Sequence, residues 1–484
     1  MVFSVRFLLV VATLVAGGQH ATAVTLNIEH YGAVAGDKSL QTAKQNVKAI
    51  NAAFADAANF SAGVKVEVPP GKEYWALGGI LGGNLHDFTF MVNGVLKALP
   101  DLKNWPLTTG HKPSYLNFLQ FVNCDNLTIS GGAGYTHTPN ALNLTANPPS
   151  GSLIDGQGVA WWNRYVLAGG PKRPKLIHVD QSKHILVENI TLLNSPNFHL
   201  LLSDVVDVEV RFVHIQVDRS EQRRLKALMG ARRRLVEAGI SGSENVEGLQ
   251  PEDLNTDGID PSGHDVWVHD TAINNDDDSI AVKPCNSERC TMSDCSENML
   301  FERMTMTGFG ASIGSVPATF PPNCVRNITF RNIDMPGTGK GVYIKSDPGC
   351  DRANASALIE NILYENVNIT KPKWWSIWIG PQQQHEPGST LGGKCPLAYP
   401  LKKPCPTQGC VTFNNITLRN IFIDRPLLSP GVILGNQTNP MKNIVFDRVV
   451  VSEGGKWPFD STYQCQYADI QAIGGTVPAP NCKD

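Results

Sequence analysis

The stretch ITFRNIDM, residues 328–335, alternates apolar and polar residues on both sides of a central Asn332. Alternation with a period of two, rich in β-branched residues, predicts a β-strand. The same template recurs along the chain as ILVENITLL from Ile185, VEVRFVHIQV from Val208, VWVHDTAIN from Val266, MLFERMTM from Met299, ILYENVNI from Ile362, ITLRNIFI from Ile416 and IVFDRVVV from Ile444. The chain therefore repeats one kind of strand many times.

The spacing of the copies indicates how these strands are arranged. Their central residues Asp270, Arg303, Asn332 and Asn366 follow one another after 33, 29 and 34 residues. A strand-only repeat with this loose period predicts a β-solenoid, in which each coil stacks on the previous one. A β-sandwich with irregular hairpins is the alternative. The repeated Asn-Ile-Thr strands, without Asn-Gly or Asp-Gly turns between them, favour the solenoid.

A solenoid needs covered ends, and both ends of the chain offer a cover. Residues 43–58 precede the first strands and have apolar residues at helical spacing, which predicts a capping helix. These apolar residues are Ala43, Val47, Ile50 and Phe54. Near the other end, Cys465 and Cys482 are expected to pin the C-terminal tail.

Residues 218–252 break the strand pattern. Their leucines recur at helical spacing and their arginines make the segment basic, which predicts an inserted basic helical segment. It is either a lip that attracts an acidic polysaccharide or a solvated, protease-sensitive insertion.

The N-terminus, MVFSVRFLLVVATLVAGGQHATA, has a basic residue, a short apolar run and an Ala-Thr-Ala site. This pattern predicts a secretory signal peptide, residues 1–23; a membrane anchor is the alternative, but the run is too short to span a bilayer. We expect residues 24–484 to form one secreted, monomeric β-solenoid domain. The net charge of −3 argues against nucleic acid as its partner.

Eleven cysteines in a secreted chain predict disulfides, and the odd count leaves at least one thiol unpaired. The spacings within the group Cys285, Cys290 and Cys295 do not match paired metal-binding knuckles. Sequons such as those at Asn59, Asn143 and Asn436 predict N-glycosylation. Other sequons lie inside the strand repeat, where a structural role for the asparagine competes with glycosylation: Asn189, Asn327, Asn368 and Asn415.

Two aspartate-rich stretches are the candidates for chemistry. NNDDDSIAV, residues 274–282, follows NTDGID, residues 255–260, so that Asp277 comes 20 residues after Asp257. In a β-solenoid this is about one coil, so the side chains would stack at roughly 4.8 Å. Carboxylates so close cannot all ionise freely, so one pKa rises and that group can act as an acid, as glycoside hydrolysis requires. A Ca²⁺ site and a solvated acidic turn are the alternatives.

These stretches, with GFGASIGS from Gly308 and YIK from Tyr343, resemble the four active-site motifs of glycoside hydrolase family 28, the polygalacturonases, in order. The family motifs typically read NTDG, DD, GHG-x-SIGS and RIK. YGAVAGDKSLQTAKQN, VEVPPG and SLIDGQGVAWW also look like family segments, so the likeness runs from about Val24 to about Val451. The resemblance implies a right-handed parallel β-helix that acts on a pectic polysaccharide without a metal or other cofactor.

The resemblance also implies roles for single residues. Asp277 matches the general acid, and Asp257 and Asp278 match the pair that positions and activates water in an inverting hydrolysis. Lys345 matches the basic residue that contacts a uronate carboxylate, a task that suits a lysine ammonium. Asn255 is expected to hold the turn beside the substrate and to hydrogen-bond Asp257.

Two positions depart from the family pattern: Phe309 replaces the usual histidine and Tyr343 the usual arginine. The loss of arginine removes a bidentate clamp for a carboxylate. Both aromatic rings are candidates for stacking on a sugar ring. Trp374, Trp375 and Trp378, interpreted as lying on one strand, are expected either to line a sugar-binding groove or to belong to the core.

We therefore expect a polygalacturonase-type enzyme that hydrolyses α-1,4-linked galacturonosyl bonds. A rhamnogalacturonan or xylogalacturonan hydrolase of the same family is the first alternative, since the two departures alter the recognition residues. A pectate lyase and a non-catalytic pectin-binding β-helix are the others.

Overall fold

The computed structural model describes residues 24–60, 63–111, 113–132, 151–162, 173–218, 220, 255–347, 350, 354–383, 395, 399–400 and 405–483. The expected signal peptide lies outside these residues. The expected basic insertion, residues 218–252, also lies outside them apart from Asp218 and Ser220.

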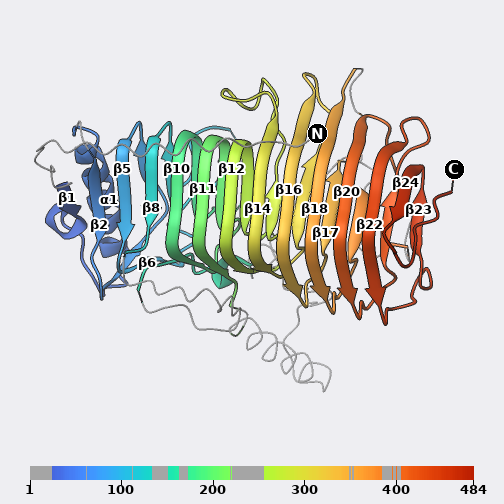
Figure 1. Ribbon diagram of the computed structural model, residues 1–484. Coiled ribbons are helices and arrows are strands. Elements are labelled where there is room, and N and C mark those ends of the chain that lie inside the picture. Colours follow the sequence, from blue (N-terminus) through green and yellow to red (C-terminus); the bar gives the residue numbers. More distant parts are fainter. Residues whose placement is uncertain are drawn as a thin grey trace, which may run out of the picture.

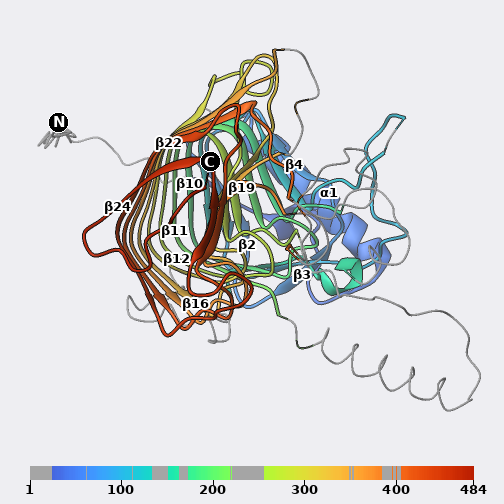
Figure 2. The same cartoon turned by 90° about the vertical axis from the view of Figure 1, so that its right-hand side faces the viewer.

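The described strands form one continuous 24-stranded sheet whose strand pairs are parallel. Figure 1 shows them side by side along a single axis, from the blue N-terminal end to the red C-terminal end. In Figure 2, which looks along the stack, successive coils superimpose. The fold is a right-handed parallel β-helix, as predicted.

The repeated template forms the long strands. They are β10 (Ile177–Leu193), β11 (Leu200–Gln216), β12 (Ile259–Asn274), β14 (Ser296–Met306), β16 (Asn323–Pro336), β18 (Ala357–Thr370), β20 (Val411–Asp424) and β22 (Met441–Ser452). From β12 onward, a second column of short strands alternates with them along the chain. This column contains β13 (Ile280–Val282), β15 (Ala311–Val316), β17 (Val342–Ser346), β19 (Ile377–Pro381), β21 (Gly431–Leu434) and β23 (Tyr463–Gln466).

The first coils are built from shorter strands. One more strand comes after β23 in the chain and pairs with the last long strand, β22. These strands are β1 (Val24–Asn27), β2 (Val64–Val68), β3 (Glu73–Ala76), β4 (Ile80–Gly83), β5 (His86–Val92), β6 (Val95–Ala98), β7 (Leu119–Val122), β8 (Asp125–Ser130), β9 (Leu153–Asp155) and β24 (Ala468–Ile473). A 3-10 helix, η1 (Ile28–Tyr31), follows β1.

The central residues of the template bend the long strands. Asn332 and Asn366 have φ values of 55° and 56°, in the left-handed region that asparagine tolerates better than most residues. The Asn366 amide donates to Asn332 Oδ1 at 3.1 Å, and the Asn420 amide donates to Asn366 Oδ1 at 2.9 Å. The centres of these three copies are therefore corners that are hydrogen-bonded from coil to coil.

A second asparagine ladder includes two of the sequons. Asn327 donates to Asn298 Oδ1 at 3.3 Å and accepts from Asn361 at 3.1 Å, and Asn415 donates to Asn361 at 2.7 Å. The structural role considered for Asn327 and Asn415 is confirmed.

The core fills the inside of the coils, where alternate side chains of each strand point. Phe301, Phe330 and Tyr364 stack along the axis with ring centroids 4.7 Å apart, one ring from each of three coils. The long apolar core is thus continuous between coils, which keeps the register of the outward-facing residues fixed.

The predicted capping helix is α1 (Leu40–Ala57), at the N-terminal end of the stack (Figure 1). The Ser39 side chain caps it by accepting a hydrogen bond from the Thr42 N–H. Phe54 packs against Phe88 and Phe90 with centroid distances of 5.4 and 5.2 Å. The helix therefore covers the apolar cross-section of the first coils.

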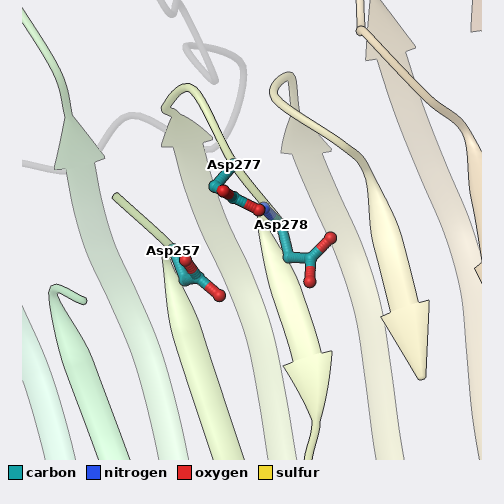
Figure 3. A group of neighbouring side chains, drawn as sticks. All are labelled: Asp257, Asp277 and Asp278. Atoms are coloured by element: carbon teal, nitrogen blue, oxygen red, sulfur yellow. The ribbon is translucent and has the colours of Figure 1, made fainter. Parts of the chain in front are cut away.

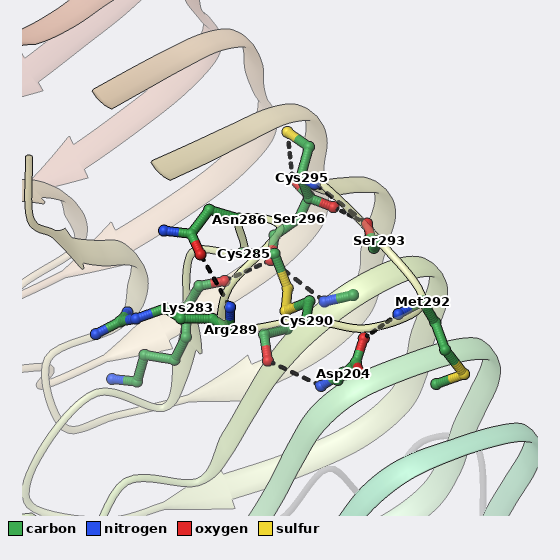
Figure 4. Close-up of a disulfide and its surroundings, with 12 residues drawn as sticks. Asp204, Lys283, Cys285, Asn286, Arg289, Cys290, Met292, Ser293, Cys295 and Ser296 are labelled. Carbon is green, nitrogen blue, oxygen red and sulfur yellow. Dashed lines mark hydrogen bonds between the residues drawn. A yellow bond between two sulfur atoms is a disulfide. The ribbon is translucent and has the colours of Figure 1, made fainter. Parts of the chain in front are cut away.

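Ten cysteines pair as five disulfides, and Cys124 is a buried free thiol, as the odd count predicts. The pairs are Cys285–Cys290, Cys295–Cys324, Cys350–Cys410, Cys395–Cys405 and Cys465–Cys482. Figure 4 shows the first of them in the loop after β13. The last one links the C-terminal tail to β23, as expected. Within the described part of the chain, no helix has the length and apolar character needed to cross a membrane.

Candidate active site

Three carboxylates gather where adjacent coils enter the short-strand column (Figure 3). Asp257 lies just before β12, and Asp277 and Asp278 lie just before β13. Ile259 pairs with Ile280, so the strand register places Asp257 opposite Asp278. One oxygen from each carboxylate lies within 4.8 Å of the other two. The one-coil separation in the sequence thus brings the aspartates together as predicted.

Asn275 holds the turn that carries two of these aspartates. Its side-chain amide donates to the backbone carbonyls of Thr256, Asp277 and Asp278 at 2.8 to 3.0 Å. Its Oδ1 accepts a hydrogen bond from the Ser279 hydroxyl at 2.9 Å. One buried amide therefore joins two coils, and sequence reasoning missed its role because a lone asparagine in a turn is common.

Asp277 is the partly exposed member of the group. Its two oxygens accept backbone N–H groups from Asn255 and Asp278, both at 2.8 Å. Burial and the charge of Asp278 nevertheless raise the pKa of Asp277, since they outweigh these hydrogen bonds. A carboxyl with a raised pKa, on the least buried residue of the three, is suited to donate a proton.

The expected hydrogen bond from Asn255 to Asp257 is wrong. Asn255 instead donates its backbone N–H to Asp277 Oδ2, from a left-handed conformation with a φ of 62°. The left-handed turn directs this N–H across to the next coil. Its contact with a substrate stays a prediction.

Asp278 is 1% exposed and both of its oxygens are engaged. The Ser312 hydroxyl donates to Oδ1 at 2.7 Å, and the Lys345 ammonium donates to Oδ2 at 2.5 Å. Burial opposes the charge on Lys345, but the carboxylates of Asp278 and Asp277 outweigh it and raise the pKa of Lys345. Lys345 thus orients Asp278, and its contact with a uronate stays a prediction.

A second ammonium lies on the other side of the group. Lys283 Nζ is 3.6 Å from Asp257 Oδ2 and 3.2 Å from Asp260 Oδ2. Burial raises the pKa of Asp257 well above its ordinary value, and it raises the pKa of Asp260 to about 6. Four carboxyls and two ammonium groups therefore share this buried region, and the carboxyls of Asp257, Asp260 and Asp277 have raised pKa values, so they hold protons more tightly than in water.

Sequence reasoning missed Lys283, although the sequence carried a signal for it. The segments IAVK, residues 280–283, and VYIK, residues 342–345, have the same pattern. The register pairs Val282 with Ile313 and Ile313 with Ile344, which places Lys283 two coils before Lys345 in the same column. An alignment of the short strands would have found it.

The three aspartate oxygens are also close enough together to suggest a cation site. Ca²⁺ takes six to eight oxygen ligands in proteins. Here Lys345 already binds Asp278, and Lys283 contacts Asp257. Two ammonium groups among the ligand atoms repel a cation, so this group does not fit a Ca²⁺ centre.

The expectation that Tyr343 stacks on a sugar is wrong. Tyr343 is 2% exposed, and its hydroxyl accepts the backbone N–H of Gln383 at 2.9 Å. It belongs to an apolar cluster on the outward face of β17 and β19, together with the fully buried Trp375 and Trp378. These two tryptophans belong to the core, and Trp375 precedes β19 rather than lying on it with Trp378.

Phe309 and Trp374 lie at the edge of this cluster and are partly exposed. Their rings meet edge to face with centroids 5.7 Å apart. Stacking of Phe309 on a sugar ring stays a prediction.

The fold and the site together define a parallel β-helix in which buried carboxylates, ion-paired with lysines, lie beside the short-strand column. The family model for glycosyl hydrolases family 28 matches residues 64–474, and the chain belongs to this family.

Among its relatives, the chain is 26% identical over 334 residues to an endo-polygalacturonase of Pectobacterium carotovorum subsp. carotovorum, covering 66% of this chain and 64% of that one. It is 25% identical over 360 residues to a polygalacturonase of Chamaecyparis obtusa, covering 72% of this chain and 55% of that one. The chain thus spans less than two thirds of the length of these relatives.

Two solved structures share the fold. The polygalacturonase from Erwinia carotovora ssp. carotovora aligns with a TM-score of 0.59 at 21% identity, covering 95% of this chain and 99% of that one. The endo-xylogalacturonan hydrolase from Aspergillus tubingensis aligns with a TM-score of 0.53 at 19% identity, covering 94% of each chain.

Proposed function

We propose that this chain is a secreted pectin-degrading enzyme that hydrolyses α-1,4-linked galacturonosyl bonds. The observation that carries the proposal is the close approach of Asp257, Asp277 and Asp278 on adjacent coils, one of them partly exposed. Family membership and the polygalacturonases among its relatives support the same reaction and a pectic substrate.

In the proposed reaction, Asp277 donates its proton to the glycosidic oxygen as the bond from that oxygen to the anomeric carbon breaks. Asp257 and Asp278 hold a water molecule, and Asp278, which is paired with the Lys345 ammonium, removes its proton while its oxygen bonds to the anomeric carbon. The raised pKa of Asp277 keeps it protonated closer to neutral pH than an ordinary aspartate. Ser312 and Lys345 keep Asp278 in one orientation.

The test is the release of reducing ends from polygalacturonate by wild type and by Asp277→Asn. We expect Asp277→Asn to lose about 10²- to 10⁴-fold in kcat, the usual contribution of a general acid. Asp276→Asn, which changes the adjacent carboxyl in the same turn, is the matched control and should keep its activity. An Asp277→Asn enzyme as active as wild type on every pectic substrate would rule out the assignment.

We further propose that the reaction inverts the anomeric configuration, the outcome that the family resemblance implies. Separations between carboxyl groups of roughly 6.5–9.5 Å are typical of inversion and about 5–5.5 Å of retention. The nearest oxygens here lie within 4.8 Å, so spacing alone favours retention. Proton NMR of the first product distinguishes inversion from retention. A β-anomer released from the α-linked substrate supports inversion, and an α-anomer refutes it.

A second candidate substrate is a different pectic backbone, such as rhamnogalacturonan or xylogalacturonan. It is favoured by Phe309 and the buried Tyr343, which replace the histidine and arginine of the family pattern. Separate digestion of the three polysaccharides distinguishes them, because only the true substrate gives a rapid rise in reducing ends.

The same digests distinguish the proposed hydrolase from two alternative functions, a lyase and a non-catalytic binding protein. A pectate lyase would give unsaturated products that absorb ultraviolet light, and EDTA would abolish its activity. A binding protein with a decayed site would bind pectic polysaccharides without cleaving them. The ion pairs that hold Asp257 and Asp278 argue against decay.

Secretion is supported by the predicted signal peptide and by the five disulfides, which form and persist in oxidising compartments. N-terminal sequencing of protein collected from the medium tests it. A first residue at Val24 is expected, and retention inside the cell would contradict it.

A further inference from the structure

Lys340 continues the line of turns that carries the aspartates. Asp277 and Asp278 lie between β12 and β13, Phe309 lies between β14 and β15, and Lys340 lies between β16 and β17. The register pairs Ile280 with Ala311 and Ala311 with Val342, so these turns are equivalent positions on consecutive coils. Lys340 is thus two coils beyond Asp278, along the direction in which a polysaccharide could extend.

The Lys340 side chain is enclosed by aromatic rings. The residue is 0% exposed. Its Nζ lies near the ring centroids of Tyr343 at 3.6 Å, Trp374 at 4.8 Å, Phe309 at 5.1 Å and Trp378 at 5.6 Å. The rings attract a cation through their negative faces but accept no ordinary hydrogen bond.

Among the described residues, Lys340 Nζ has no hydrogen-bond partner. A buried ammonium without a partner is costly, and an apolar residue of the same length would pack in this cluster without that cost. Burial and the charge of Lys345 lower the pKa of Lys340 well below its ordinary value. Packing alone therefore does not account for a lysine at this position.

The other two lysines beside the aspartates are already paired. Lys345 binds Asp278, and Lys283 lies between Asp257 and Asp260. Within the described part of the site, Lys340 is the lysine that no carboxylate of the protein neutralises. It also contacts the ring of Tyr343, the residue that stands where the family pattern has an arginine.

We propose that Lys340 binds a carboxylate of a uronate unit of the substrate, and so replaces the arginine lost at Tyr343. This inference rests on the proposed function, and it assigns substrate recognition to a residue outside the four motifs. The bound carboxylate supplies the missing partner of the ammonium, and the two form a hydrogen-bonded ion pair in a dry site.

Access to the ammonium lies on the side of Phe309 and Trp374, the partly exposed rings of the four. Their edge-to-face contact closes this side of the enclosure. Rotation of either side chain opens it, and the displaced ring can then pack on the sugar.

The test measures binding separately from cleavage, in an Asp277→Asn background that holds the substrate intact. Trigalacturonate and its methyl ester are titrated by calorimetry into this protein with and without Lys340→Met. Lys340→Met keeps the length of the side chain and removes the charge. Lys442→Met, on the exposed face of β22, is the matched control, and Lys340→Gln is a second neutral variant should the first not fold.

We expect Lys340→Met to weaken trigalacturonate binding about 10- to 100-fold, the effect of losing one charge-assisted hydrogen bond. Binding of the methyl ester should change less than about twofold by the same reasoning, since it carries no charge for Lys340 to meet. Equal effects on the two ligands, no effect on either, or no binding of trigalacturonate at all would overturn the proposal. A failure of the proposed function would be seen in a separate measurement, because the wild-type protein would then not cleave the substrate.

Discussion

Substitution of Lys345 by methionine tests the electrostatics of the site most sharply. The variant removes the ammonium that lies 2.5 Å from Asp278 Oδ2 and leaves the rest of the coil unchanged. The Asp278 side chain is 1% exposed and the Lys345 side chain 6%, so water cannot replace the lost partner.

The magnitude follows from this burial. Charges about 4 Å apart attract by about 4 kcal/mol at an effective dielectric constant of 20, and desolvation of both groups offsets much of this. Removal of one partner leaves the other buried and uncompensated, which costs about 3–5 kcal/mol. We expect Lys345→Met to lose this much free energy of unfolding.

The assay is urea unfolding followed by circular dichroism, combined in a double-mutant cycle with Asp278→Asn. The double variant should lose clearly less than the sum of the two single losses, because it leaves no unpaired charge. A loss of less than about 1 kcal/mol in the free energy of unfolding of Lys345→Met would refute the reasoning, since the removal of one partner from a buried ion pair is strongly destabilising. Strictly additive losses would refute it as well.

Three further predictions address the site and the cap. Burial raises the pKa of Asp260 from 3.8 to about 6, so its contribution to stability is present below about pH 4 and is lost as pH rises through 6. Asp260→Asn should therefore gain about 2–3 kcal/mol relative to wild type between pH 4 and 7, as measured by urea unfolding; a difference independent of pH would contradict this. Dialysis against EDTA should leave the release of reducing ends unchanged, because ammonium groups take the place of a cation, whereas a loss restored by Ca²⁺ would contradict the site. Phe54→Ala should cost about 3–5 kcal/mol in unfolding free energy, because it opens a cavity between α1 and the first coils, and an unchanged stability would show that α1 does not cap them.

The fold could be predicted because its signals are local. Each strand carries its own alternation of apolar residues, and most corners carry an asparagine or aspartate, such as Asn332, which tolerates a positive φ. The repeat then sets the register, and the register alone brings Asp257 beside Asp278. The cluster of three aspartates could therefore be predicted from the spacing of the sequence motifs.

The surroundings of the aspartates were harder to predict, because they depend on contacts between outward-facing side chains of different coils. Tyr343 looked available to a sugar from its position, but Trp375 and Trp378 from the following coil cover it. The pairing of Lys345 with Asp278, two coils earlier, could not be read from the sequence either. Periodicity fixes which face a side chain takes and says little about what covers that face.

The most direct test of the central claim, that three stacked aspartates hydrolyse a galacturonosyl bond, is mass spectrometry of the products formed from polygalacturonate. The account predicts saturated oligogalacturonates, each cleavage adding one water, from wild type and almost none from Asp277→Asn. Unsaturated products, or equal yields from the two proteins, would contradict it.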